Sequence, residues 1–148
     1  MKKHGECIST SLGNQFHLGV LYSIMIDETK GIFKVSNGKY SEEYLLEDLT
    51  KYFKIILTQS EFIELMKTNL GIVDEEIIEF RNNGEDTICM KYKHDLMYIK
   101  FLDKSNTFTL AVNIEITSNN LARQKTFTIE LFEDDINKFC NLLKLMHK

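Results

Sequence analysis

The sequence predicts an α+β fold, in which an antiparallel sheet of about five to seven strands carries two or three helices. Apolar and polar residues alternate over residues 107–117 and again over 126–131, as in strands with one buried face. Residues 133–148 then carry an apolar stripe at helical spacing. Strands in succession followed by a helix favour an antiparallel sheet with the C-terminal helix packed on it.

The composition predicts a single domain over residues 1–148 that is long enough to bury its own core. No apolar run is long enough for a membrane span, and the start of the chain shows no signal-peptide pattern, so we expect a cytoplasmic protein. The three cysteines are far apart in sequence and predict free thiols. We expect no cofactor and no bound metal.

The charged residues disfavour a general nucleic-acid binder. The net charge is −4, whereas such proteins are usually basic. Only Arg81 and Arg123 are arginines among the 18 basic residues, so the bidentate forks that bind phosphate are scarce. The predominance of lysine, with no proline or tryptophan, indicates an AT-rich coding sequence, as in a low-GC bacterium or an element that infects one.

The first third of the chain predicts strands and one helix. Residues 1–16 predict an irregular start or a weak strand. The apolar run 18–26 favours a buried strand, with a helix as the alternative, and 31–36 predicts a returning strand. A helix is expected from Ser41, an N-cap residue with acidic residues after it. A strand that begins near Tyr52 is the alternative.

The remainder has clearer signals. Thr58 and Glu61 have capping-box spacing, and Gly71 suits the residue that closes the helix. A hairpin is expected from 87–92 and 96–102, with His94 and Asp95 in its turn. Turns or loops are expected at 82–84 and 118–124. The C-terminal helix begins with acidic residues 133–135.

The predicted hairpin presents one wet face that suits partner binding. With the turn at His94 and Asp95, Lys93 lies opposite Leu96 and Lys91 lies opposite Tyr98. Cationic and aromatic side chains together bind nucleic-acid strands or acidic protein surfaces; a solvated sheet face is the plainer interpretation. The candidate contact residues are Lys91, Lys93, Tyr98, Lys100 and Lys104.

No catalytic or metal-binding constellation emerges from the other polar residues. His4, Cys7 and His17 are too few for a zinc site. A turn explains His94 and Asp95 better than a base with its orienting carboxylate. Residues 9–15 lack a phosphate-loop pattern, and Cys140 lies on an apolar stripe, which favours packing over reactivity.

Two stretches resemble known groups of small proteins. Residues 57–66, LTQSEFIELM, resemble a helix that recurs in phage and prophage accessory proteins, where a Ser-Gln-rich start leads into a Phe-x-x-Leu/Ile core. The meander that ends in Phe132-Glu133-x-x-Ile136-x-x-Phe139-x-x-Leu142-Leu143 is similar in outline to small bacterial immunity proteins. Neither resemblance carries a catalytic motif.

These observations predict a non-enzymatic protein-binding accessory protein. The favoured form is a phage or mobile-element inhibitor that occludes a host defence protein. One alternative is an immunity protein that meets a basic toxin through an acidic face around Glu75, Glu76 and Glu79. Another is a small nucleotide- or nucleic-acid-binding protein, which needs a polar pocket or groove.

Overall fold

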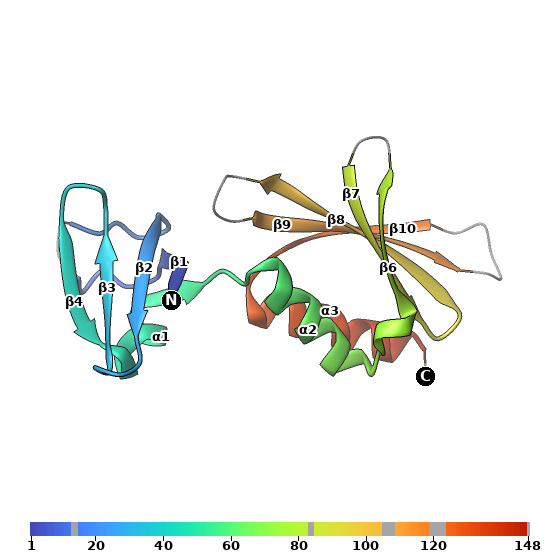
Figure 1. Cartoon of the computed structure of the whole chain (residues 1–148), viewed down its shortest axis with the longest axis horizontal. Helices are drawn as coiled ribbons and strands as arrows, with labels where there is room; N and C mark the ends of the chain where they lie inside the picture. The colour runs from blue at the N-terminus through green and yellow to red at the C-terminus, as the bar shows by residue number, and fades with distance from the viewer. Residues whose placement is uncertain (13–14, 83–84, 105–108, 119–123, 148) are drawn as a thin grey trace. The chain divides into compact units, whose positions relative to one another are not determined.

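A computed structural model describes residues 1–12, 15–82, 85–104, 109–118 and 124–147. Within them the chain forms three α-helices and ten strands, and the predicted α+β class is confirmed. The strands make two five-stranded antiparallel sheets (Figure 1). The chain divides into two compact units, Met1–Ile56 and Leu57–Lys148. That residues 1–148 behave as a single domain, with both units unfolding together, stays a prediction.

The first unit is a sheet in the order β4-β3-β2-β1-β5. The segment predicted as an irregular start or weak strand forms β1, a central strand between β2 and β5. Gly5 lies in tight packing there, because a Cβ atom at this position would lie 2.7 Å from Cδ1 of Ile24 and would force that side chain to shift. The strands are β1 (Lys2–Cys7), β2 (Leu21–Asp27), β3 (Ile32–Ser36), β4 (Ser41–Leu45) and β5 (Phe53–Ile55).

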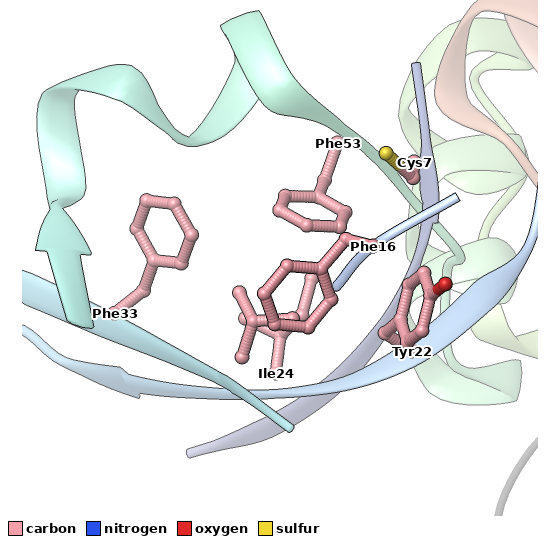
Figure 2. Close-up of a cluster of buried hydrophobic side chains, with 7 residues drawn as sticks. Cys7, Phe16, Tyr22, Ile24, Phe33 and Phe53 are labelled. Atoms are coloured by element: carbon pink, nitrogen blue, oxygen red, sulfur yellow. The ribbon is translucent and has the colours of Figure 1, made fainter. Parts of the chain in front are cut away.

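Aromatic rings fill the core of the first unit (Figure 2). The ring of Phe33 lies 6.1 Å from that of Phe53 in an edge-to-face arrangement, and the Phe16 and Tyr22 rings meet in the same way at 5.1 Å. Such pairs add stability beyond the burial of their area. The buried members of this cluster are Cys7, Phe16, Tyr22, Ile24, Phe33, Val35 and Phe53.

The helix predicted from Ser41 is wrong. Ser41–Leu45 is strand β4, and helical structure is confined to a 3-10 turn, η1 (Leu46–Asp48), and to α1 (Leu49–Tyr52). In the strand, Tyr44 packs its ring 5.4 Å from that of Phe33. Tertiary packing of this kind overrides local helix propensity. The alternative, a strand that begins near Tyr52, is confirmed as β5.

The second unit is a sheet in the order β10-β9-β8-β7-β6, with α2 and α3 on one of its faces (Figure 1). The C-terminal helix α3 packs against β10 and α2, as predicted. The elements are α2 (Gln59–Leu70), η2 (Asp74–Glu76), β6 (Ile77–Asn82), β7 (Glu85–Tyr92), β8 (Asp95–Lys104), β9 (Thr109–Ser118), β10 (Gln124–Glu130) and α3 (Glu133–Met146).

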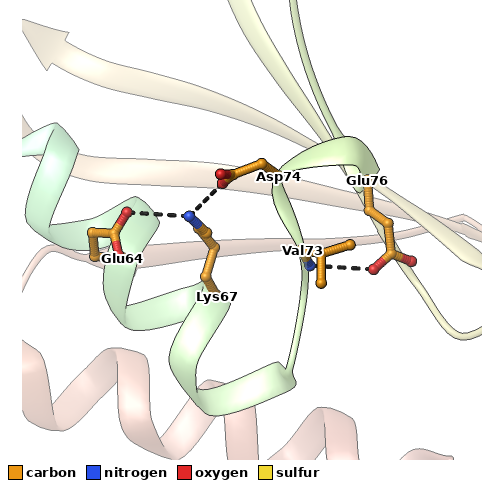
Figure 3. Close-up of polar contacts among 5 residues, drawn as sticks. All are labelled: Glu64, Lys67, Val73, Asp74 and Glu76. Carbon is orange, nitrogen blue, oxygen red and sulfur yellow. Dashed lines mark hydrogen bonds and ion pairs between the residues drawn. The ribbon is translucent and has the colours of Figure 1, made fainter.

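Helix α2 has the ends that its sequence predicts. The Glu61 amide donates to the Thr58 hydroxyl at 3.2 Å, and the Thr58 amide donates to the Glu61 carboxylate at 2.9 Å. Gly71 closes the helix in the left-handed conformation, with φ 66°. In the last turn of the helix, the Lys67 ammonium forms ion pairs with Glu64 of α2 and with Asp74 of η2 (Figure 3). The second ion pair ties η2 to the helix.

The helix-covered face of the second sheet is apolar. Side chains that alternate along β7, β8 and β9 are fully buried beneath α2 and α3: Met90, Met97, Ile99, Val112 and Ile114. Cys140 of α3 is buried with them, and burial raises the pKa of its thiol to about 11. The prediction that Cys140 serves packing is confirmed by its place in this core.

Several predicted features fall on residues that the structure leaves undescribed. They are Gly13 and Asn14 in the polar start, Asn83 and Gly84 of the predicted turn, Phe108 of the alternating strand and residues 119–123 of the predicted loop. No helix among the described residues is both long and apolar enough to cross a membrane.

Candidate functional site

The face of the second sheet opposite α2 and α3 brings most of the predicted contact residues together. Successive side chains of a strand point to opposite faces, so the neighbours of the buried residues point away from the helices. We call this surface the outer face. It comprises Ile78, Phe80, Thr87, Cys89, Lys91, Leu96, Tyr98, Lys100, Asn113 and Glu115.

Tyr98 lies near the middle of the outer face. In register, it stands between Cys89 of β7 and Glu115 of β9. Its ring meets that of Phe80 edge to face, with the centroids 6.3 Å apart. Phe80 and Ile78 expose 38% and 61% of their surface, and both come from β6, which the sequence reasoning did not identify. The outer face therefore has an exposed apolar centre.

Two of the four predicted lysines flank this centre. Lys91 is exposed opposite Leu96, and Lys100 is half-buried between Thr87 and Asn113. Lys104 has the same strand parity as Lys100 and pairs with Thr109 at the end of β8. Its side chain lies outside the described part of the structure.

The predicted position of Lys93 on this face is wrong. The hairpin turns at Lys93 and His94, so that Tyr92 pairs with Asp95 and Cys89 pairs with Tyr98. Lys93 has a left-handed φ of 58°, and its ammonium lies 5.9 Å from the centre of the Tyr92 ring, on the helix-covered side. The other hairpin residues stay on their predicted faces, because the observed register differs from the predicted one by two residues, an even number.

The shifted turn places Asp95 inside the strand rather than in the turn. Asp95 is buried and lies 2.8 Å from Nε2 of His147, which also meets the Tyr92 ring edge to face at 5.2 Å. The turn favoured for His94 and Asp95 is confirmed for His94, which is exposed in it, and is wrong for Asp95, which lies in β8. The pair of Asp95 and His147 ties the C-terminal end of α3 to the β7–β8 hairpin.

Two buried oxygens lie beside Lys100 on the outer face. The hydroxyl of Thr87 and the amide oxygen of Asn113 have no hydrogen-bond partner within the described structure. Both residues lie opposite Lys100, one in each neighbouring strand. A buried polar atom without a hydrogen-bond partner lowers the stability of the folded state. Thr87 and Asn113 therefore each reduce the free energy of unfolding of the second unit.

Replacing Thr87 with valine is therefore expected to stabilise the second unit by about 1 kcal/mol, because it removes an unpartnered hydroxyl and keeps the shape of the side chain. Thermal and denaturant unfolding measure the change. Thr126→Val, at an exposed position on β10, is the matched control and should change stability by less than about 0.5 kcal/mol. A loss of stability in Thr87→Val would show that the hydroxyl has a partner, such as an ordered water.

The residues considered for a metal site point apart. His4 and Cys7 are three positions apart on β1, so they lie on opposite faces of the sheet. Burial and the nearby Lys2 lower the pKa of His4. The Cys7 thiol donates to the Ser9 carbonyl at 3.2 Å. Among the described residues, no group of three or more His, Cys, Asp or Glu side chains can hold a metal ion.

A pocket of about 470 Å³ lies between the first turns of α2 and strands β6 to β8. Ile63, Ile88 and Phe101 form its apolar wall. Its charged groups are Glu79, Arg81 and Asp86, with Arg81 held 3.1 Å from Asp86. Two carboxylates beside one guanidinium are a poor match for phosphate, which counts against the nucleotide-binding alternative.

The acids of the immunity-protein alternative do not act as one set. Glu76 uses its carboxylate locally, accepting the Val73 amide hydrogen at 3.2 Å (Figure 3). Glu75 is exposed in η2, whereas Glu79 lies further along the chain in β6. Only two of the three carboxylates are left to meet a basic partner.

No protein-family model, curated protein or solved structure matches this chain. The fold and the site define it by themselves as an α+β protein of two antiparallel-sheet units, with an uncovered, aromatic-centred sheet face in the second unit.

Proposed function

We propose that this chain is a non-enzymatic, protein-binding accessory protein and that the outer face is its contact surface. The observation that carries the proposal is the cluster of exposed Ile78 and Phe80 with half-buried Tyr98, on a sheet face that α2 and α3 leave uncovered. Aromatic side chains at the centre of a contact dominate the energetics of most protein interfaces. Exposed apolar patches with polar surroundings are typical of such surfaces.

The composition of the outer face indicates what the partner offers. Its centre needs an apolar complement, because Ile78, Phe80 and Leu96 cannot satisfy polar groups. Lys91 at the side of the cluster favours an acidic residue on the partner, as charge complementarity orients association. Glu115 adds an opposite charge next to Tyr98, so the surface as a whole is mixed in charge. This mixture favours a protein over a nucleic-acid backbone.

The inhibitor of a host defence protein, carried by a phage or another mobile element, remains the biological role that we propose. Occlusion of a host surface needs contact area and shape but no catalytic group. The lysine-dominated composition, with only two arginines and no proline, supports an origin in a low-GC bacterium or in an element that infects one.

A double substitution of Tyr98→Ala and Lys91→Glu is expected to weaken partner binding at least about tenfold, since it removes a central aromatic contact and reverses a flanking charge. The melting temperature should change little, because neither side chain is in the buried core. A tagged pull-down from a low-GC bacterial lysate, with and without nuclease, identifies the partner. Titration of the purified partner then measures the affinity.

The matched control changes one exposed tyrosine and one lysine of the first unit, Tyr40→Ala with Lys39→Glu, and should bind as the wild type does. Equal affinity for the Tyr98→Ala, Lys91→Glu protein and the wild type would exclude the outer face. Recovery that nuclease abolishes would contradict a protein partner and support the nucleic-acid alternative.

A further inference from the structure

Strand β6 is an open edge of the second sheet. It pairs with β7 on one side only, so alternate backbone amides and carbonyls point away from the sheet, as in any edge strand. Glu79, Phe80 and Arg81, at the centre of β6, are all exposed. An antiparallel second copy of this segment, centred on Phe80, would place Arg81 opposite Glu79 and Phe80 opposite Phe80. The segment is therefore complementary in charge to itself.

The other three edges that the structure describes lack this property. Strand β5 is only three residues long, Phe53–Ile55, and a very short edge strand offers little to pair with. Strand β4 carries Glu42 and Glu43 side by side, and a second β4 strand would bring carboxylates together.

Strand β10 carries Lys125 on the helix side of the sheet, where Phe127 and Ile129 share its face and no acidic residue of a second β10 could oppose it. An inward-facing charge without a partner is a common protection against edge pairing. The inward-facing Glu79 and Arg81 of β6 differ, because their charges are opposite and can pair across two copies. Self-pairing is therefore favoured at β6 alone among these edges.

The side-chain pattern favours one register for two antiparallel β6 strands. A register centred on Ile78 would pair only residues 77–79 of the strand, so the registers to compare are those centred on Glu79, Phe80 and Arg81. When both copies keep their helices on the same side of the joined sheet, opposed residues have numbers of the same parity. With Glu79 opposite its own copy, two carboxylates meet, and with Arg81 opposite its own copy, two guanidinium groups meet. With Phe80 on the axis, each Glu79 lies opposite Arg81 of the second copy, and both pairs are complementary.

We infer that the protein forms a symmetric dimer through β6, with Phe80 opposite Phe80 of the second copy and two Glu79–Arg81 pairs across the two-fold axis. A closed, isologous contact of this kind is the commonest symmetry among soluble oligomers. The two sheets then form one continuous sheet, and their hydrogen bonds satisfy the open edge.

The existing contacts of β6 fit this arrangement. Phe80 already leans on Tyr98, with the ring centroids 6.3 Å apart, so the paired rings would continue an aromatic row across the axis. Arg81 holds Asp86 at 3.1 Å, and its guanidinium has five donors, enough for Asp86 and for Glu79 of the second copy together. The dimer goes beyond the proposed function and does not depend on it.

Charge exchange tests the inferred register. In an Asp86→Asn background, which removes the competing carboxylate, Glu79→Arg or Arg81→Glu alone brings like charges together twice. Each is expected to raise the dimer dissociation constant about tenfold. The combination of Glu79→Arg and Arg81→Glu restores both pairs and should return the dissociation constant to that of the background protein. Sedimentation equilibrium of the 148-residue chain over a wide concentration range measures these values.

A cross-link provides the second measurement, with the dimer read on a non-reducing gel. Phe80→Cys puts two thiols opposite each other at the axis, at cross-strand separations that suit a disulfide, and oxidation should give a covalent dimer. Thr126→Cys, exposed on β10 at the other edge, is the matched control and should not cross-link. A monomer at all concentrations would overturn the inference. So would a dimer in which Glu79→Arg changes nothing or Phe80→Cys fails to cross-link.

Discussion

Replacing Phe33 with alanine is expected to destabilise the first unit by about 3–5 kcal/mol, because it leaves a large cavity in a core built of rings. Phe33 is fully buried, and its ring packs 5.4 Å from Tyr44 and 6.1 Å from Phe53. A cost of this size is a large fraction of the stability of a small unit. We therefore expect the first unit to unfold at physiological temperature while the second keeps its structure.

Amide hydrogen exchange, resolved by residue, measures which strands lose protection in Phe33→Ala. Protection should disappear over Met1–Ile56 and persist over β7 to β9, since each unit has its own sheet and buried side chains. Phe33→Leu is the control, with an expected cost of about 1.5 kcal/mol or less. Loss of protection along the whole chain would contradict independent units and establish the single cooperative domain that the sequence predicts.

The second large effect is expected from Phe62→Ala in α2. Phe62 is fully buried, and its ring meets that of Phe101 edge to face, 5.7 Å away. Its removal is expected to cost the second unit about 3–5 kcal/mol, through the lost transfer energy and the cavity left behind. Because the outer face belongs to the sheet that this helix supports, partner binding should fall together with stability.

Near-ultraviolet circular dichroism and denaturant titration follow the packing of Phe62→Ala, and the partner affinity is measured on the same samples. Glu64→Ala, an exposed position on the same helix, should stay within about 0.5 kcal/mol of the wild type and bind normally. Full affinity in a protein whose second unit has unfolded would place the contact elsewhere and remove the outer face from the proposal.

Local sequence signals were enough to predict the elements whose ends are marked by capping or turn residues. The capping box at Thr58 and Glu61, the left-handed Gly71 and the acidic first turn of α3 belong to neighbouring residues. Strands β3, β7, β8 and β9 follow from alternation, because a sheet with one covered face imposes a period of two. Face membership in the hairpin was also predictable, since it depends only on parity.

Signals that depend on distant residues misled the sequence reasoning or escaped it. Residues 41–45 carry helix-start chemistry but pair with β3, where Tyr44 reaches the core. Strand β6 was not predicted, although its β-branched Ile77 and Ile78 precede a turn-rich stretch. As a result, Ile78 and Phe80 were not assigned to the outer face. Lys93 left that face because the turn begins at Lys93, which lets Asp95 enter the strand and meet His147.

By itself, the sequence determined the α+β class, the position of α2 and α3 and the two faces of the β7–β8 hairpin, because capping and alternation are contacts between near neighbours. Only the tertiary structure decided that the strands divide into two sheets, that β6 is an open edge and that Phe80 lies against Tyr98. These features depend on which strands pair. Strand pairing is set by the burial of side chains from distant parts of the chain, which no local pattern records.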